Sequence, residues 1–92
     1  MKIVFDPIKS KKNEMERGLP FSLAHEFDWQ SAVYREDIRF DYPERRFVAV
    51  SNLGGRLHFI CFSRIEDGVR IISFRKASKN EVKEYEQETA DR

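Results

Sequence analysis

The sequence predicts an α+β fold whose sheet is antiparallel and four-stranded after a first strand and two helices. Three strand-like runs in the second half of the chain are separated by two tight-turn signals, Gly54-Gly55 and Asp67-Gly68. Helix-start signals occur near both ends of the chain. The expected order is strand, helix, helix, four strands and a final helix. We expect residues 1–92 to form one domain, because this length suits a single hydrophobic core.

The first strand and helix follow from local backbone chemistry. Residues 2–5 form a short strand. Asp6 then caps a helix, because its carboxylate can accept hydrogen bonds from free N–H groups, and Pro7 suits the first helical position. Gly18 ends this helix. Its apolar stripe is thin, so the helix needs support from the rest of the fold; the stripe consists of Ile8 and Met15.

The sequence also predicts two further helices, one more strand and a loop, each from a short stretch of residues. Residues 21–27 form a second short helix with its apolar side chains inward, and residues 32–38 form a strand. Residues 41–44 form a loop. Ser78 and Glu81 make a capping box that opens the last helix. The inward residues of these two helices are Phe21, Leu23, Ala24, Phe27, Val82 and Tyr85.

The Gly54-Gly55 turn predicts the register of the first hairpin, in which Leu53 faces Arg56. Alternation along the strands then assigns side chains to two faces. One face, which we expect helices to cover, carries Val48, Val50, Leu57, Phe59, Cys61, Ile72 and Phe74. The other face carries Phe47, Ala49, Ser51, His58, Ile60, Phe62, Ile71, Ser73 and Arg75. We expect this second face to form a groove or a partner surface.

Composition excludes several classes of protein. The single cysteine, Cys61, cannot form an internal disulfide, and two scattered histidines with one cysteine do not make a metal site. No cofactor is predicted. No segment resembles a signal peptide or a membrane span, so the expected location is the cytoplasm. The net charge is +1 although 36% of residues are charged, so any anion-binding surface must be local.

His58 and Arg75 are the first candidates for chemistry, because both are predicted on the same face. A histidine can transfer a proton near neutral pH, and the planar guanidinium of Arg75 suits a phosphate or the charge that develops on it. Two other interpretations remain open. In the first, His58 is only a partly buried strand histidine that is hydrogen-bonded to a neighbour such as Ser51. In the second, Arg75 only pairs with an acid on the last helix.

Further basic residues are candidates for contacts to RNA. Arg70 opens the last predicted strand and is the third candidate for catalysis. The candidates for RNA binding are Arg56, Lys76, Arg46, Arg17 and Lys12, the last of these in a run with Lys9 and Lys11. Solvated side chains without a ligand are the alternative for all of them. Trp29 and Tyr42 can stack on bases or pack in the fold.

Several separate pieces of the chain, taken together, resemble the BrnT family of toxins from type II toxin–antitoxin pairs. The pieces are Phe5-Asp6-Pro7 with Lys9, Asn13, Gly18 with Phe21, Glu44-Arg45 or Arg46, Gly54-Gly55-Arg56, and Arg70-Ile71-Ile72-Ser73 followed by Arg75-Lys76-Ala77, Glu81 and Tyr85. The chain departs from the pattern of many members at Phe5, where they have Trp, and at Glu16-Arg17, where they have Lys-His.

The resemblance implies a RelE/ParE-like fold, cleavage of RNA without a metal, and an antitoxin partner similar to BrnA that carries the DNA-binding part. Attack by a ribose 2′-hydroxyl needs only proton transfer and charge stabilisation, which side chains can supply. We expect the antitoxin to cover the basic face, with three apolar residues as its anchor: Ile60, Phe62 and Ile71.

Two other functions remain open. A non-catalytic protein-binding module could share the same fold as an inactive homologue of the toxin. Direct DNA binding is the third possibility, but the sequence has no helix-turn-helix pattern and its net charge is only +1.

Overall fold

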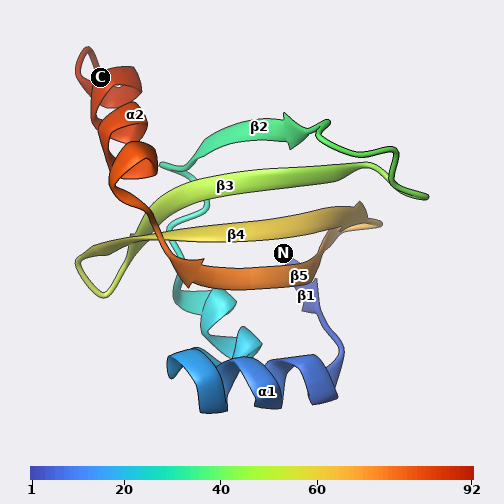
Figure 1. Cartoon of the computed structure of the whole chain (residues 1–92). Coiled ribbons are helices and arrows are strands. Elements are labelled where there is room, and N and C mark those ends of the chain that lie inside the picture. The colour runs from blue at the N-terminus through green and yellow to red at the C-terminus, as the bar shows by residue number, and fades with distance from the viewer.

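The computed structural model describes residues 1–92, and its five strands form one mixed sheet (Figure 1). The elements are β1 (Lys2–Val4), α1 (Pro7–Arg17), the 3-10 helix η1 (Phe21–Glu26), β2 (Val33–Asp37), β3 (Arg46–Leu53), β4 (Arg56–Ile65), β5 (Gly68–Lys76) and α2 (Lys79–Thr89). The strand order is β1-β5-β4-β3-β2. The antiparallel arrangement predicted for β2 to β5 is confirmed.

The strand predicted over residues 2–5 is present as β1, but it joins the sheet as a fifth strand, where a four-stranded sheet was predicted. β1 runs parallel to β5, and Lys2 lies opposite Gly68. A Cβ atom at Gly68 would lie 1.8 Å from the carbonyl oxygen of Lys2, so only glycine permits this approach. β1 can therefore complete the edge of the sheet.

Both helix-capping predictions are confirmed. An Asp6 carboxylate oxygen accepts a hydrogen bond from the Ile8 N–H at 2.9 Å, and Gly18 ends α1 in the left-handed region at φ 70°. The Ser78 hydroxyl accepts from the Glu81 N–H at 3.2 Å, and the Glu81 carboxylate accepts from the Ser78 N–H at 2.8 Å. These local signals therefore set where α1 and α2 begin.

The apolar stripe of α1 faces solvent, contrary to its expected role in packing. Ile8 and Met15 are 79% and 78% exposed. Ser10 is the buried residue of this helix, and its hydroxyl accepts a hydrogen bond from the Phe21 N–H at 2.8 Å. A polar contact to the start of η1, together with Asn13, which donates to the carbonyls of Leu19 and Phe74, therefore attaches α1 to the fold.

The first hairpin has the predicted register, with Leu53 opposite Arg56, but a β-bulge changes the second hairpin. Phe62 pairs with Ile71, whereas the preceding Cys61 pairs with Ser73, so Ile72 is an extra residue in β5. The extra residue inverts the alternation from Ser73 onward. The predicted faces of Ser73, Phe74 and Arg75 were therefore wrong.

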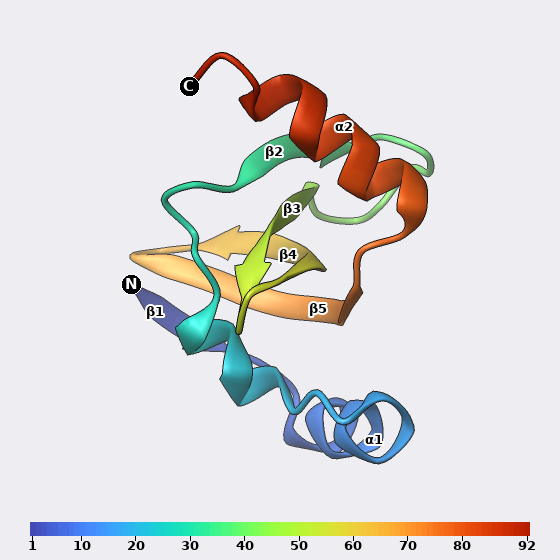
Figure 2. The ribbon, with the colours of Figure 1, turned by 90° about the vertical axis from the view of Figure 1, so that its left-hand side faces the viewer.

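The predicted covered face was also wrong. Figures 1 and 2 show α1 and η1 on one side of the sheet and α2 on the other. The main core lies between η1 and the sheet face that we expected to be open; its sheet residues are Ala49, Ile60, Phe62, Val69, Ile71 and Phe74. Small side chains at Ala24 and Ala49, both 0% exposed, let η1 approach closely. Ile60, Phe62 and Ile71 are consequently too deeply buried to anchor an antitoxin.

Candidate functional site

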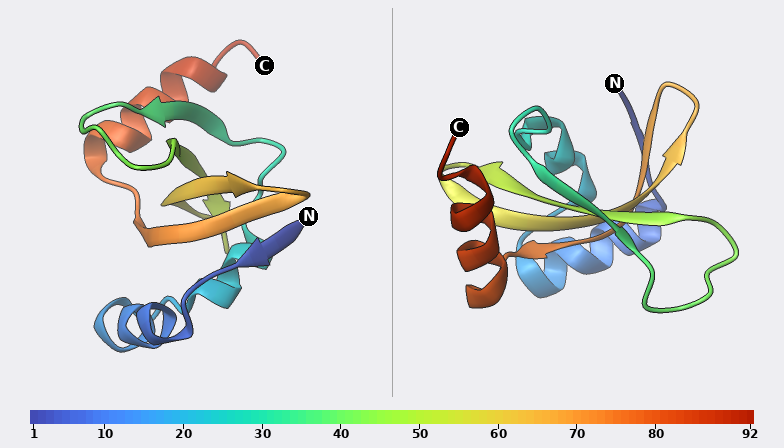
Figure 3. Two further views of the ribbon diagram at one scale, coloured as in Figure 1. Left: turned by 90° about the vertical axis from the view of Figure 1, so that its right-hand side faces the viewer. Right: turned by 90° about the horizontal axis from the view of Figure 1, so that it is seen from above.

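An open groove of about 960 Å³ lies on the sheet face away from α1, and α2 forms one of its walls. Figure 3 shows α2 across one end of the sheet and the β2–β3 loop, residues 38–45, projecting from the other end. The floor of the groove is apolar and consists of Val48, Val50, Phe59, Cys61 and Ile72. Burial raises the pKa of the Cys61 thiol, so this side chain contributes to the floor as a small neutral group.

Arg75 lies at the α2 end of the groove in a defined geometry. Its Nη1 and Nη2 atoms donate to the two carboxylate oxygens of Glu81 at 2.8 and 2.9 Å. The guanidinium carbon lies 3.9 Å from the centre of the Phe59 ring. The alternative interpretation of Arg75, as a partner of an acid on the last helix, is therefore confirmed. These hydrogen bonds lower the pKa of the Glu81 carboxyl, which keeps it ionised.

The opposite end of the groove is a second cluster of charged and aromatic groups. Arg39 donates to both carboxylate oxygens of Asp37 at 2.9 Å, and the Tyr42 hydroxyl donates to Asp37 at 3.0 Å. The Arg39 hydrogen bond is the main reason that the pKa of Asp37 is lowered to about 2. The Arg46 guanidinium carbon lies 4.2 Å from the centre of the Tyr42 ring.

The four arginines that line the groove are not equivalent. Arg39 and Arg75 are paired as described, and Arg35 of β2 donates to Glu84 of α2. Arg46 has no carboxylate partner, and its buried Nε atom has no hydrogen-bond partner. The groove thus offers one arginine that is free to meet an anion and three whose carboxylate partners an anion would displace.

His58 lies away from this groove, on the covered face of the sheet. It is 5% exposed, its ring packs edge-on against Phe74 at 5.9 Å, and its Nδ1 atom lies 2.9 Å from the Arg56 carbonyl oxygen. The expected neighbour, Ser51, donates instead to the carbonyl of Asp28. The prediction that His58 and Arg75 share a face was wrong, because the bulge turned Arg75 to the other side.

The other basic candidates are dispersed. Arg70 is on β5, on the groove side of the sheet, and lies 3.8 Å from Glu44. Arg56 and Lys76 are exposed at the hairpin end of β4 and at the end of β5. Arg17 is exposed at the end of α1. The structure brings Arg46 and Arg75 to the same groove and leaves the rest outside it.

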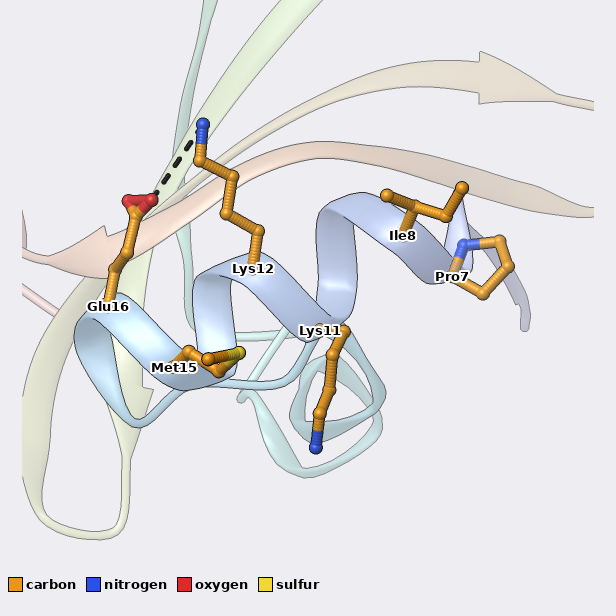
Figure 4. A pocket seen from close by; sticks show the side chains of 6 residues that line it. All are labelled: Pro7, Ile8, Lys11, Lys12, Met15 and Glu16. Atoms are coloured by element: carbon orange, nitrogen blue, oxygen red, sulfur yellow. Dashed lines mark ion pairs between the residues drawn. The ribbon is translucent and has the colours of Figure 1, made fainter.

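Lys12 lies on the outer side of α1, beside a shallow hollow of about 550 Å³ (Figure 4). Its ammonium group pairs with Glu16 at 3.7 Å, and both side chains are largely exposed. Lys11 in turn pairs with Glu14 at 3.1 Å. Surface pairs of this kind contribute little to stability, and here they also offset the positive charge of the helix.

Sequence reasoning missed four of the residues that shape the groove: Arg35, Asp37, Arg39 and Glu84. Alternation along the strand of residues 32–38 would have placed Arg35 and Asp37 on one face, but nothing local indicated that this face lines a groove. Glu81 was recognised as a helix cap and as part of the family resemblance, but not as a residue of the groove. Its second contact, with Arg75, depends on the bulge.

The groove of this small α+β protein is lined by four arginines and four carboxylates, and Arg46 is the arginine there without a carboxylate partner. A family described as "Ribonuclease toxin, BrnT, of type II toxin-antitoxin system" matches residues 5–81. The chain therefore belongs to the BrnT family of ribonuclease toxins. No curated protein and no solved structure matches it. The match ends at Glu81, so most of α2 lies beyond it.

Two further observations concern membrane-spanning helices and groups of metal-binding side chains. No helix in the structure combines the length and the hydrophobicity needed to cross a membrane. No group of three or more His, Cys, Asp or Glu side chains is arranged to hold a metal ion.

Proposed function

We propose that residues 1–92 form one toxin domain that cleaves RNA without a metal in the groove between the sheet and α2. Membership of a ribonuclease toxin family supports RNA as the substrate. The observation that carries the site is the position of Arg75, whose guanidinium fork lies at the wall of the groove, over Phe59. We infer a RelE/ParE-like arrangement for this fold and action in the cytoplasm, where RNA is accessible.

In this proposal, Arg75 stabilises the negative charge that develops on the phosphate. A phosphate under attack by the neighbouring 2′-hydroxyl gains negative charge in the transition state, and a planar guanidinium can donate two hydrogen bonds to its oxygens. Stacking on Phe59 holds the plane of the Arg75 guanidinium and leaves its N–H groups to form hydrogen bonds at the edge of that plane. The edge is occupied by Glu81 in the free protein, so the phosphate must take the place of this carboxylate.

The displaced Glu81 carboxylate is the proposed general base. When the phosphate takes Arg75, Glu81 loses the Arg75 hydrogen bond, the main cause that lowers its pKa, so the carboxylate becomes a stronger base. The proton of the 2′-hydroxyl passes to Glu81 as the 2′-oxygen bonds to phosphorus. The bond to the 5′-oxygen then breaks, and this oxygen takes a proton from water. The products are a 2′,3′-cyclic phosphate and a 5′-hydroxyl.

The roles of the other candidates follow from their positions. His58 contributes to the core, because it is buried on the other face. Arg46 binds RNA within the groove, and Arg70 binds at its far end instead of taking part in the chemistry. Arg56 and Lys76 lie near the α2 end and Arg17 and Lys12 on α1, where they contribute long-range attraction to RNA.

An antitoxin similar to BrnA is the proposed protein partner. Its apolar anchor is proposed in the groove instead of on the buried core residues, because Phe59 and Ile72 in the groove are only partly buried. A partner that fills the groove prevents RNA from reaching Arg75, and it carries the DNA-binding function of the pair. An acidic segment would match the groove arginines.

Expression and cleavage tests can examine this function directly. We expect the wild-type chain to arrest bacterial growth unless the antitoxin is co-expressed, and to cleave RNA equally with and without EDTA. Arg75→Ala should reduce the cleavage rate by about a hundredfold or more while the protein stays folded. Arg64→Ala removes an exposed arginine outside the groove and should change little.

Two results would count against the proposal. Cleavage by Arg75→Ala at the wild-type rate would place the chemistry elsewhere. A folded wild-type protein that binds the antitoxin but cleaves no RNA would favour the non-catalytic module.

A further inference from the structure

The β2–β3 loop, residues 38–45, exposes two large apolar side chains at the end of the groove remote from α2. Ile38 is 81% and Phe40 is 68% exposed. Figure 1 shows that this loop projects beyond the sheet, so the core does not use it. Large apolar side chains that a small domain leaves exposed beside a groove indicate a binding surface.

Aromatic rings and guanidinium groups alternate in this loop. The Arg39 guanidinium carbon lies 5.9 Å from the centre of the Phe40 ring, and Phe40 meets Tyr42 edge-on at 5.8 Å. Arg46 stacks on Tyr42 at the base of the loop. Proteins bind single-stranded nucleic acid with such interleaved surfaces, because bases stack on aromatic rings while arginines contact the backbone.

Unsatisfied polar atoms lie directly behind this surface. The Nε atom of Arg46 and the Oγ atom of Ser63 are both buried and have no hydrogen-bond partner. Arg46 and Ser63 face each other in the register of β3 and β4, and Ser63 is 0% exposed. Both atoms are closed to solvent, so a ligand would meet Arg46 through the rest of its partly exposed side chain, which is free of internal hydrogen-bond partners.

Charge favours an anion as the ligand of Arg46. Three of the nearby acids are engaged, Asp37 by Arg39, Glu36 by Arg45 and Glu44 by Arg70, whereas Asp41 is exposed and forms no ion pair. Arg46 alone among the groove arginines has no carboxylate within 4 Å. A phosphate can satisfy Arg46 without displacing any internal partner, unlike at Arg75.

We propose that this end of the groove is a nucleotide subsite, in which an unpaired base stacks on Phe40 and its phosphate binds Arg46. The inference rests on the proposed function, since it takes RNA as the ligand. Arg46 on β3 lies opposite Ser63, and Arg75 on β5 lies opposite Phe59. Four residues along β4 and two interstrand spacings across it separate the two arginine backbones by roughly 16 Å. The substrate is therefore single-stranded RNA long enough to contact both ends, and this subsite governs binding, not chemistry.

Binding of an uncleavable probe tests the subsite without reference to cleavage. The probe is a labelled, single-stranded 2′-O-methyl oligonucleotide, whose affinity is measured by fluorescence anisotropy. We expect Phe40→Ala to weaken binding by about tenfold, because loss of one stacked base has an effect of this order. Phe40→Trp should restore the affinity. Ile8→Ala is the matched control, since it removes a similarly exposed apolar side chain from α1, outside the groove, and should bind as the wild type does.

Salt dependence tests the phosphate contact. We expect Arg46→Gln to reduce the slope of log affinity against log salt concentration by about 0.7, the value for one phosphate contact on a single strand. Phe40→Ala should leave this slope unchanged. Arg64→Gln, outside the groove, should also leave it unchanged.

Several results would overturn the subsite. They are equal affinity of Phe40→Ala and Ile8→Ala, equal affinity of the wild type for a duplex and a single strand, and no binding of the probe by the wild type. Reduced antitoxin binding by Phe40→Ala with unchanged oligonucleotide affinity would assign the loop to the protein partner instead.

Failure of the subsite and failure of the proposed function are distinguishable. If RNA is cleaved through Arg75 while Phe40→Ala changes neither KM nor probe affinity, the subsite is wrong and the function stands. If the probe binds through Phe40 but RNA is not cleaved, the catalytic function is wrong and the subsite stands. With both correct, Phe40→Ala raises KM and leaves kcat unchanged.

Discussion

Glu81 combines two tasks at the scale of single side chains. Its carboxylate accepts from the Ser78 N–H, which caps α2, and also holds both terminal nitrogens of Arg75. A residue used in this way orients the guanidinium even before RNA binds. The same contact keeps Glu81 ionised, which a general base requires.

Glu81→Gln separates the capping of α2 from proton transfer. The amide oxygen can still accept from Ser78, but the side chain can no longer take a proton. We therefore expect a folded protein whose cleavage rate falls roughly a hundredfold or more. Single-turnover cleavage assays measure the rate. Glu84→Gln is the control, because Glu84 also pairs with a groove arginine from α2 but has no proposed part in proton transfer. Equal rates for both variants would remove Glu81 as the base.

The lowered pKa of Asp37 predicts how the free energy of unfolding changes at acid pH. The Arg39 hydrogen bond is the main cause that lowers the pKa of Asp37 from 3.8 to about 2, so the fold binds the ionised form preferentially. This stabilisation is present above about pH 3.8 and is lost as the pH falls through about 2. Asp37→Asn should therefore flatten the decline of stability across this interval, measured by urea denaturation at several pH values.

The control for the acid experiment is Asp41→Asn, which changes an exposed carboxylate of the adjoining loop. It should keep the wild-type dependence on pH. If Asp37→Asn shows the same decline as the wild type, the Arg39 contact does not persist in solution.

At the scale of elements, α2 is held to the sheet in an unusual way. None of its residues is buried, and its contacts with the rest of the chain include the ion pairs of Glu81 with Arg75 and of Glu84 with Arg35. Helices in small proteins usually depend on the burial of an apolar face. We therefore expect α2 to open more readily than the strands, and its N-terminal cap to matter for its order.

Ser78→Ala tests the cap. Loss of this hydroxyl leaves the Glu81 N–H without its partner and should destabilise α2 by about 1 kcal/mol. Hydrogen exchange of the α2 amides should become faster while exchange in β3 and β4 stays unchanged. Asn80→Ala, an exposed change in the same turn, is the control. Uniform acceleration across the sheet would show that α2 and the core open together.

The bulge in β5 is the element that most affects the site. The extra residue, Ile72, turns Phe74 into the core and Arg75 into the groove. Without it, the alternation would place Phe74 in the groove and bury an arginine against η1. Burial of an unpaired charge is far more costly than local disruption of a ladder, so the fold accommodates the bulge.

At the scale of the whole molecule, the sheet separates a packed side from a binding side (Figure 2). The packed side holds the protein together, whereas the groove side presents arginines on an apolar floor. This division predicts different results for two phenylalanines on adjacent strands.

Phe74→Ala and Phe59→Ala form a matched pair for this division. Phe74 is 1% exposed in the core, so its truncation should lower the free energy of unfolding by about 3–5 kcal/mol. That is a large part of the stability of a small domain, roughly 5–15 kcal/mol. Phe59 lies in the groove floor, so its truncation should destabilise less but impair cleavage by releasing Arg75. Denaturation and cleavage assays compare them, and the reverse order of stability would contradict the assignment of faces.

Short-range signals were sufficient to predict much of this fold. Asp6, Gly18 and Ser78 marked helix ends, because capping depends on atoms within a few residues. Gly54-Gly55 set the register of β3 and β4, because both glycines take the positive φ angles of the turn, 60° and 82°. Arg75 was recognised as a candidate from its sequence alone, although for a face that it does not occupy.

Tertiary packing decided which face is buried and which residues meet in the groove. Both faces of the three-strand unit contain enough apolar side chains for a core, so alternation could not choose between them. The choice depends on where η1 packs, and the position of the bulge depends on which side chain, Phe74 or Arg75, can enter that core. Contacts between residues far apart in the chain determine both, and these contacts bring Arg46 and Arg75 into one groove while they remove His58 from it.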